Sequence, residues 1–425
     1  MKQILATIFI FILSFYVSPH VMAKSIAENE SSQQSNKKKT HKHKHKQTLA
    51  VGATYDKNGT LWLAEVKDKK LLVSYSQNMG ESFSIPTAVT PIPEDIYADG
   101  ENRPKIAISK NGTILLTWSQ KQQKKYSGDI RFSRSTDSGK TFSLPITLND
   151  DGLITGHRFD SLTTDGQGKV IISWLDARDR DAARNRNEKF TGISIYTAQS
   201  NDNGENFDIN KKFHEHVCEC CRIPSVWTTN GPIIFWRNIF GKNTRDFAIS
   251  NLEKGGVRRV TNDEWQVDGC PHHGGDIALG SDNRLHLVWF TLGKTRQGLF
   301  YKHIQGTGES SPIPIGDPTS QASHPSITAS GKNVLVTWRE FDGKKITANI
   351  MYSADGGSTW SDQKRLADTK GPSDYPVPLI NNEQQMQIVW NTKTEGLRII
   401  PVGNNLNFQT SILNLYTNLK NELFE

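Results

Sequence analysis

One eight-residue pattern occurs four times in the chain, and it constrains the fold more than any other feature of the sequence. It reads Ser-x-Asp-x-Gly-x-Thr-aromatic, with close replacements in some copies, at residues 76–83, 135–142, 200–207 and 353–360. In a tight turn, Asp and Ser/Thr side chains hydrogen-bond nearby backbone amides, and glycine takes up a positive φ. Four copies therefore predict a repeated hairpin turn.

A second repeat runs through the whole chain. A short β-rich segment containing tryptophan recurs at Trp62, Trp118, Trp174, Trp236, Trp289, Trp338 and Trp390. These tryptophans are 49 to 62 residues apart, which is about the length of a four-stranded propeller blade. The two repeats together predict an all-β fold, a six- or seven-bladed β-propeller of four-stranded blades with the eight-residue motif at its turns. An irregular β-sandwich would not explain such even spacing.

The N-terminus has the features of an export signal. Lys2 precedes an apolar stretch at residues 4–17, and small residues end at Ala23 with the spacing of a cleavage site. We therefore expect a signal peptide over residues 1–23, a secreted or periplasmic protein, and no transmembrane segment after cleavage.

Residues 24–47 form a segment rich in Lys, His, Ser and Gln, which predicts a disordered linker. Seven lysines against two glutamates in this linker account for most of the formal charge of +7, so the charge gives no indication of a nucleic-acid partner. The run Lys37–Lys46 suits an anionic envelope polymer, and its alternating histidines suit soft metal ions; a plain solvated spacer is the other interpretation. The propeller is expected over residues 48–410 and a C-terminal tail over 411–425.

The four-copy motif resembles the Asp-box, or BNR repeat, of the bacterial sialidase superfamily, over roughly residues 48 to 402. The resemblance implies a propeller with a binding site in its central depression. It does not by itself imply sialidase activity, because Asp-boxes are structural turns that also occur in propellers of other functions.

Six polar segments lead into the innermost strands of the predicted blades, and we call them the axial segments. Because such segments converge on the central channel of a propeller, we expect them to share one face. They are residues 101–104, 157–160, 218–222, 268–273, 323–325 and 374–376.

Sialidase chemistry, as the resemblance implies it, needs arginines to hold a sugar carboxylate, a tyrosine nucleophile with a carboxylate base, and a carboxylic acid. The candidate nucleophile is Tyr375, with Glu219 as the base and Asp160 or Asp99 as the acid. The candidate substrate-binding residues are Arg103, Arg158, Arg222 and Arg237. The pattern departs from the family, because the Arg-Ile-Pro motif stands in mid-chain at residues 222–224. Surface ion pairs between blades are the structural interpretation of the same arginines.

All four cysteines fall in two axial segments. In an exported chain, two disulfides are the expected outcome, with three pairings open. The alternative is a copper or zinc site, since thiolates and imidazoles are suitable ligands for both ions. Its candidate ligands are Cys220, Cys221, Cys270, His272 and His273.

The leading functional hypothesis is therefore an exported propeller that binds or hydrolyses an acidic glycan, in the manner of an exo-α-sialidase; the sequence establishes no cofactor, and copper or zinc is the candidate ion. The rivals are a metal-handling or redox-linked envelope protein that uses the Cys/His segments, and a non-catalytic interaction scaffold.

Overall fold

The computed structural model describes residues 48–403. The signal peptide (1–23), the linker (24–47) with Lys37–Lys46, and the tail (411–425) lie outside the described residues, so they stay predictions. No helix among the described residues is long and apolar enough to cross a membrane.

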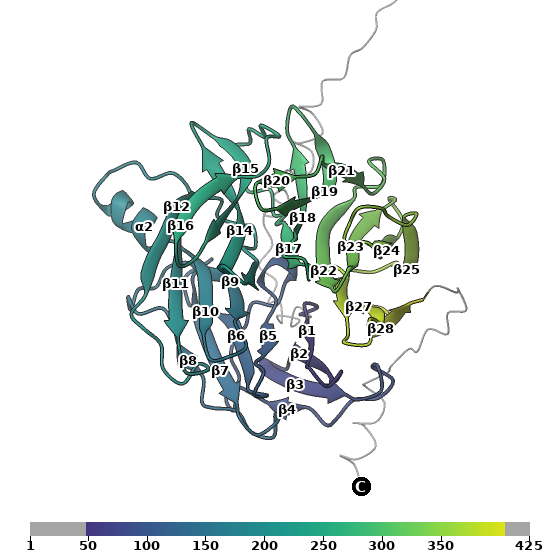
Figure 1. Ribbon diagram of the computed structural model, residues 1–425. Coiled ribbons are helices and arrows are strands. Elements are labelled where there is room, and N and C mark those ends of the chain that lie inside the picture. The colour runs from purple at the N-terminus through teal and green to yellow at the C-terminus, as the bar shows by residue number, and fades with distance from the viewer. Residues whose placement is uncertain (1–47, 404–425) are drawn as a thin grey trace, which may run out of the picture. The chain divides into compact units, whose positions relative to one another are not determined.

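The regular secondary structure of the described chain is almost entirely antiparallel β-strands, which follow one another in sets (Figure 1). The first two sets are β1 (Gly52–Tyr55), β2 (Leu61–Lys67), β3 (Lys70–Ser76) and β4 (Thr87–Ala88), then β5 (Lys105–Ile108), β6 (Ile114–Lys121), β7 (Gly128–Ser135) and β8 (Ile146–Thr147). The next two are β9 (His157–Thr164), β10 (Val170–Asp176), β11 (Ile193–Ser200) and β12 (Lys211–Val217), then β13 (Ser225–Thr228), β14 (Gly231–Phe240), β15 (Thr244–Asn251) and β16 (Gly255–Arg259).

The remaining strands form three further sets. These are β17 (Asp276–Leu279), β18 (Leu285–Leu292), β19 (Gln297–Gln305), β20 (Gly308–Glu309) and β21 (Ile313–Ile315); β22 (Ser323–Ser330), β23 (Asn333–Phe341), β24 (Ile346–Ser353) and β25 (Lys364–Thr369); and β26 (Val377–Ile380), β27 (Met386–Thr392) and β28 (Gly396–Val402). The described helices are α2 (Arg178–Asn185) and the one-turn 3-10 helix η1 (Gly100–Asn102).

The first strand of each set lies beside the first strand of the next, and β26 returns to lie beside β1. The third and fourth sets share one eight-stranded sheet, although β12 and β14 pair in register at a single position, Val217–Asn238. Figure 1 shows the sheets following one another around a common centre in chain order. This cyclic order is the one expected of a β-propeller, and the all-β prediction is confirmed.

The recurring tryptophans explain the spacing of the sets. Each lies on the second strand of its set and is buried. A buried indole N–H needs an acceptor, and each of the seven has one. The acceptors are side chains of Asp56, Glu94, Asp176, Asn238, Asp263 and Glu340, and the backbone carbonyl of Asp374.

The four-copy motif forms the turn after β3, β7, β11 and β24, as the sequence predicts. In the third copy, Ser200 Oγ accepts a hydrogen bond from the backbone N–H of Gly204 at 2.8 Å, and Asp202 accepts one from Asn206 N at 2.9 Å. The motif glycine also packs against the preceding set. A Cβ on Gly204 would lie 2.4 Å from Cζ of Phe132, which is buried on β7.

The motif glycines are therefore expected to be constrained by packing as well as by backbone conformation. Gly204 has a φ of +77° and Gly59 a φ of +80°, but nothing lies within 4 Å of a Cβ added to Gly59. We predict that Gly59→Ala lowers the free energy of unfolding by about 1 kcal/mol, through the left-handed backbone alone. Gly204→Ala should lower it by a further ~1–3 kcal/mol through overpacking. Urea denaturation of the two variants measures the difference, and equal losses would show that the contact with Phe132 is not tight.

Candidate functional site

The axial segments meet around a buried ion pair between Glu101 and Arg222. Arg222 Nη1 donates to Glu101 Oε1 at 3.1 Å, and the backbone N–H of Arg222 donates to Oε2 at 2.9 Å. Gly274 N donates to the same Oε2 at 3.2 Å, and the Arg222 guanidinium also donates to the carbonyls of Gly275 and Pro325. The expectation that these segments converge is therefore met.

A second buried group joins Arg103 to Asp374 and Tyr375. Arg103 Nε lies 2.9 Å from the Tyr375 hydroxyl, and Nη2 lies 3.0 Å from Asp374 Oδ1. The guanidinium carbons of Arg103 and Arg222 lie 3.9 and 4.7 Å from the centre of the Tyr375 ring. The tyrosine ring is thus in contact with two cations.

Tyr375 itself is only 4% exposed. Burial raises the pKa of its hydroxyl, and the charges of Arg103 and Arg222 oppose this without reversing it. The ring of His324 stacks on that of Tyr375 at 5.9 Å, and a Cβ on Gly100 would lie 2.9 Å from the tyrosine ring. The Tyr375 ring is therefore closely packed where His324 and Gly100 contact it.

The carboxylates predicted from sequence lie in other contacts. Asp160 is buried and accepts hydrogen bonds from Thr117 and Ser119, and it pairs with Lys105 at 3.7 Å. Asp99 caps η1 by accepting from the backbone N–H of Asn102 at 3.2 Å. No contact brings either of them to Tyr375 among residues 48–403. The carboxylates that join the tyrosine cluster are Glu101 and Asp374.

Arg237 is a structural arginine. Its side chain is 1% exposed, and Nη2 donates to the backbone carbonyls of His273 and Phe290 at 2.9 and 2.8 Å. Its guanidinium carbon lies 4.3 Å from the Phe247 ring centre. The Arg237 guanidinium therefore already donates to backbone carbonyls, and the N–H groups that do so are not free to bind a substrate carboxylate.

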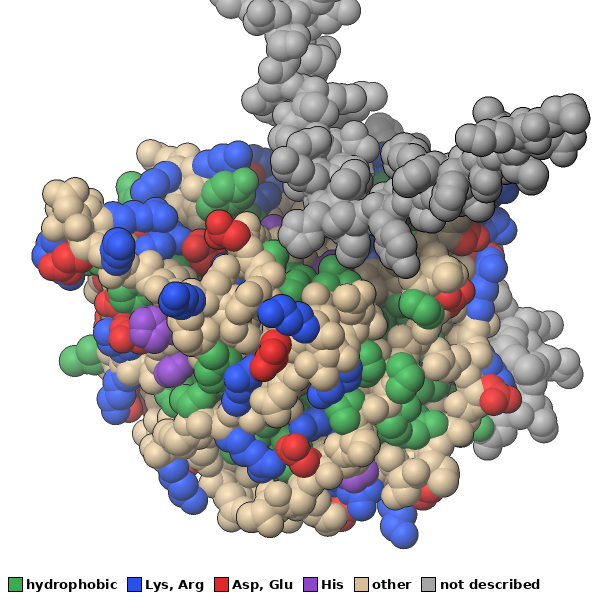
Figure 2. Space-filling view, turned by 90° about the horizontal axis from the view of Figure 1, so that it is seen from above, with side chains coloured by type: hydrophobic (Ala, Val, Ile, Leu, Met, Phe, Trp, Pro, Cys, Tyr) green, Lys and Arg blue, Asp and Glu red, His purple; other side chains and the backbone are tan. Residues whose placement is uncertain are grey.

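A cavity of about 520 Å³ opens beside the axial segments. Its walls come from the β6–β7 loop, the start of β9, helix α2, and the loops before β13 and β17. Five basic and two acidic residues line it, namely Lys124, Lys125, Arg158, Arg180 and Arg184 against Asp181 and Glu219, together with Tyr126, Phe159, Cys220, Cys270 and His272. Figure 2 shows Lys and Arg side chains interspersed with Asp and Glu over one face of the molecule.

Arg158 is the predicted substrate-binding arginine that lines this cavity. Its guanidinium carbon lies 4.8 Å from the Phe159 ring centre and 5.6 Å from that of Tyr126. Within residues 48–403, no carboxylate forms an ion pair with Arg158 or with Lys125. In that part of the chain neither charge is neutralised by an ion pair, and the Arg158 guanidinium also lies 5.3 Å from the centre of the Tyr97 ring.

The predicted base, Glu219, lines the same cavity and not the tyrosine cluster. It pairs with Arg180 of α2 at 2.5 Å, and Arg180 also contacts Asp181 at 3.3 Å. These pairs fix the α2 wall of the cavity.

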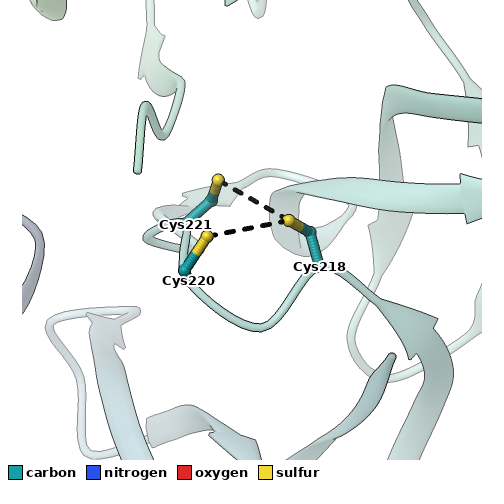
Figure 3. A group of neighbouring side chains, drawn as sticks. All are labelled: Cys218, Cys220 and Cys221. Carbon is teal, nitrogen blue, oxygen red and sulfur yellow. Dashed lines mark hydrogen bonds between the residues drawn. The ribbon is translucent and has the colours of Figure 1, made fainter. Parts of the chain in front are cut away.

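The four cysteines carry free thiols, and no disulfide joins any two of them in the described part of the chain. The predicted disulfides are therefore not supported. The Sγ of Cys218 lies 4.0 Å from that of Cys220 and 3.9 Å from that of Cys221 (Figure 3). Hydrogen bonds from Cys220 and Cys221 lower the pKa of the Cys218 thiol well below its usual value, in spite of its burial.

The remaining candidate ligands divide between two places. Cys220, Cys270 and His272 have ligand atoms within 4.8 Å of one another. His273 belongs to neither thiol group; its ring lies 4.3 Å from that of Phe290 and 4.8 Å from that of His324. Burial, with the charge of Arg237, lowers the pKa of His273 to about 3, which keeps the ring neutral.

Sequence reasoning missed several functional residues. Glu101 stands in an axial segment, but nothing in the sequence pairs it with a residue 121 positions away. Cys218 belongs to the predicted cysteine segment but not to the expected ligand set. The cavity-lining arginines of α2 could have been suspected from the sequence, because an Arg-rich insertion stands between the Trp174 strand and the third Asp-box.

No protein-family model matches the sequence, and a comparison with curated proteins gave no match. Solved structures do match. One is a polysaccharide lyase described as an ulvan lyase, at TM-score 0.52 and 12% identity, covering 84% of this chain and 93% of that chain. Others are an α-L-arabinanase of Penicillium chrysogenum (TM-score 0.46, 16% identity, 71% and 92% covered) and an α-L-arabinofuranosidase of Fusarium graminearum (0.44, 14%, 83% and 90%). At 12% identity, the likeness to the lyase concerns the fold alone.

Proposed function

We propose that this protein binds an acidic glycan in the cavity lined by Arg158, Lys125, Tyr126 and Phe159. The observation that carries the proposal is a pair of cations, Arg158 and Lys125, which have no carboxylate partner within residues 48–403 and lie beside aromatic rings in a cavity with an excess of basic residues. A guanidinium binds a carboxylate or sulfate through two parallel hydrogen bonds, and an aromatic face packs on a sugar ring.

The similar ulvan lyase has been described with a bound glycan, written -[GlcA(1-4)Rha3S]-. That likeness concerns the fold, so the proposal rests on the cavity itself. We further propose that the propeller has seven blades, with the eight-stranded sheet counted as two, and that the protein acts outside the cytoplasm, where such glycans occur.

The test compares oligosaccharides that differ in charge. Isothermal titration with a uronate-containing tetrasaccharide and with a neutral tetrasaccharide of the same length is expected to show binding of the first, weakened by added salt. Arg158→Ala should weaken it by about tenfold or more, since a hydrogen bond to a charged group contributes roughly 1.5–3 kcal/mol.

The matched control is Arg258→Ala. It removes the same charge from a half-exposed side chain that pairs with Glu309 at 3.0 Å and does not line the cavity. Its affinity should equal that of the wild type. Equal binding of the neutral and acidic sugars, or an Arg158→Ala variant that binds as the wild type does, would refute the proposal.

A second candidate function is hydrolysis of a sialoside. It is favoured by the contact of Tyr375 with Arg103 and Arg222 and by Glu101, which pairs with Arg222. In this version Glu101 takes the role of base that the sequence suggested for Glu219. The burial of Tyr375 and the raised pKa of its hydroxyl make this the weaker candidate.

For this candidate the expected result is turnover of a fluorogenic sialoside that disappears in Tyr375→Phe and persists in Tyr75→Phe. The control removes a hydroxyl from a tyrosine that is 36% exposed and packs on Trp62. Wild-type protein that gives no turnover over a broad pH range would exclude the sialidase reaction while leaving glycan binding intact.

A further inference from the structure

Three cysteine side chains point toward one another in the loop between β12 and β13 (Figure 3). Cys218, Cys220 and Cys221 are all buried, and their sulfur atoms lie within 4.8 Å of one another. They are enclosed by an apolar core that includes Phe159, Leu175, Ile193, Ile223 and Trp236. We call these three residues the inner thiol group.

A second group shares one of these sulfurs. Cys220, Cys270 and His272 also have ligand atoms within 4.8 Å of one another, and we call them the outer group. Cys270 and His272 come from the loop before β17, are exposed, and line the cavity with Cys220. The shared Cys220 thus connects the cavity to the buried sulfurs.

The spacing of the inner sulfurs fits coordination of one ion. A metal–sulfur bond of about 2.3 Å gives sulfur–sulfur edges of about 3.8 Å in a tetrahedral site and about 4.0 Å in a trigonal site. The observed separations are 3.9 Å between Cys218 and Cys221 and 4.0 Å between Cys218 and Cys220.

The surroundings also suit thiolates. Arg245 Nη1 donates to Cys218 Sγ at 3.2 Å, which is the kind of outer contact that orients a metal ligand and balances its charge. A single buried cysteine is an ordinary core residue. Packing alone does not explain four cysteines and a histidine from two loops converging on one point.

We propose that Cys218, Cys220 and Cys221 bind one thiophilic metal ion, Cu(I) or Zn(II), which reaches them from the cavity through Cys270 and His272. Each coordinating thiol releases its proton to solvent, and the oxidation state of the ion does not change. Thiolates favour these ions over Mg²⁺ and Ca²⁺. The metal ligands and the cations proposed to bind a glycan are different side chains of one cavity, so the metal titration and the glycan titration test the two proposals separately.

The test uses reduced full-length protein under anaerobic conditions. Cu(I) is titrated against bicinchoninate and Zn(II) against a chromophoric chelator. A variant with His41, His43 and His45 replaced by alanine separates the histidines of the N-terminal run from the thiol site. We expect this variant to bind one equivalent of at least one of the two ions. X-ray absorption of the bound ion should show sulfur neighbours at about 2.3 Å.

In the same background, Cys220→Ser should weaken binding by at least about a hundredfold, because it removes the sulfur common to both groups. Cys270→Ser should weaken it by only about tenfold, because the inner group remains. A variant that misfolds is recognised by circular dichroism, and the wild type then provides the second measurement. In urea just below the unfolding midpoint, where the buried thiols become reactive, bound ion should slow their alkylation relative to the ion-free protein. No binding of either ion, unprotected thiols, or binding that is unchanged in a folded Cys220→Ser variant would overturn the proposal.

Discussion

The ion pair between Glu101 and Arg222 is the interaction on which the centre of the molecule depends. A buried carboxylate is costly unless its oxygens accept hydrogen bonds, and Glu101 accepts three, two from Arg222 and one from Gly274. Arg222 in turn donates to the carbonyls of Gly275 and Pro325. One pair therefore ties together segments that precede β5, β13 and β17 and the start of β22. These contacts hold the backbone just after Cys220 and just after His272, which both line the cavity.

The fold could be predicted from sequence because its signals are local. An Asp-box places its serine, aspartate, glycine and aromatic residue within eight positions, so its hydrogen bonds can be recognised without knowing the fold. The tryptophans repeat because each occupies the same position on the second strand of its set. The sequence did not predict that the third and fourth sets share one sheet. They pair in register only between Val217 and Asn238, and no sequence pattern indicates a pairing of that kind.

The site could be predicted only in part, because the use of an arginine depends on partners far away in sequence. The sequence does not distinguish the four candidate substrate-binding arginines, Arg103, Arg158, Arg222 and Arg237. In the structure, Arg237 bonds to backbone carbonyls, Arg103 and Arg222 bond to carboxylates, and Arg158 lines the cavity. Glu219, the base that the sequence suggests for Tyr375, pairs with Arg180 instead, because α2, an insertion in the third set, brings its own cations. In the described residues the central cluster is therefore largely satisfied by its own partners, and the basic cavity beside it is the more accessible surface.

Glu101 and Arg222 are expected to act as a unit, and a double-mutant cycle tests this most directly. The unfolding free energies of Glu101→Gln, Arg222→Met and the double variant are measured by urea denaturation. Each single variant should lose about 3–5 kcal/mol, because it leaves one buried charge without its partner. The double variant should lose less than the sum of the two, by at least about 1 kcal/mol of coupling. Losses that simply add would show that the two side chains are stabilised independently, and would contradict the conclusion that this ion pair holds the axial segments together.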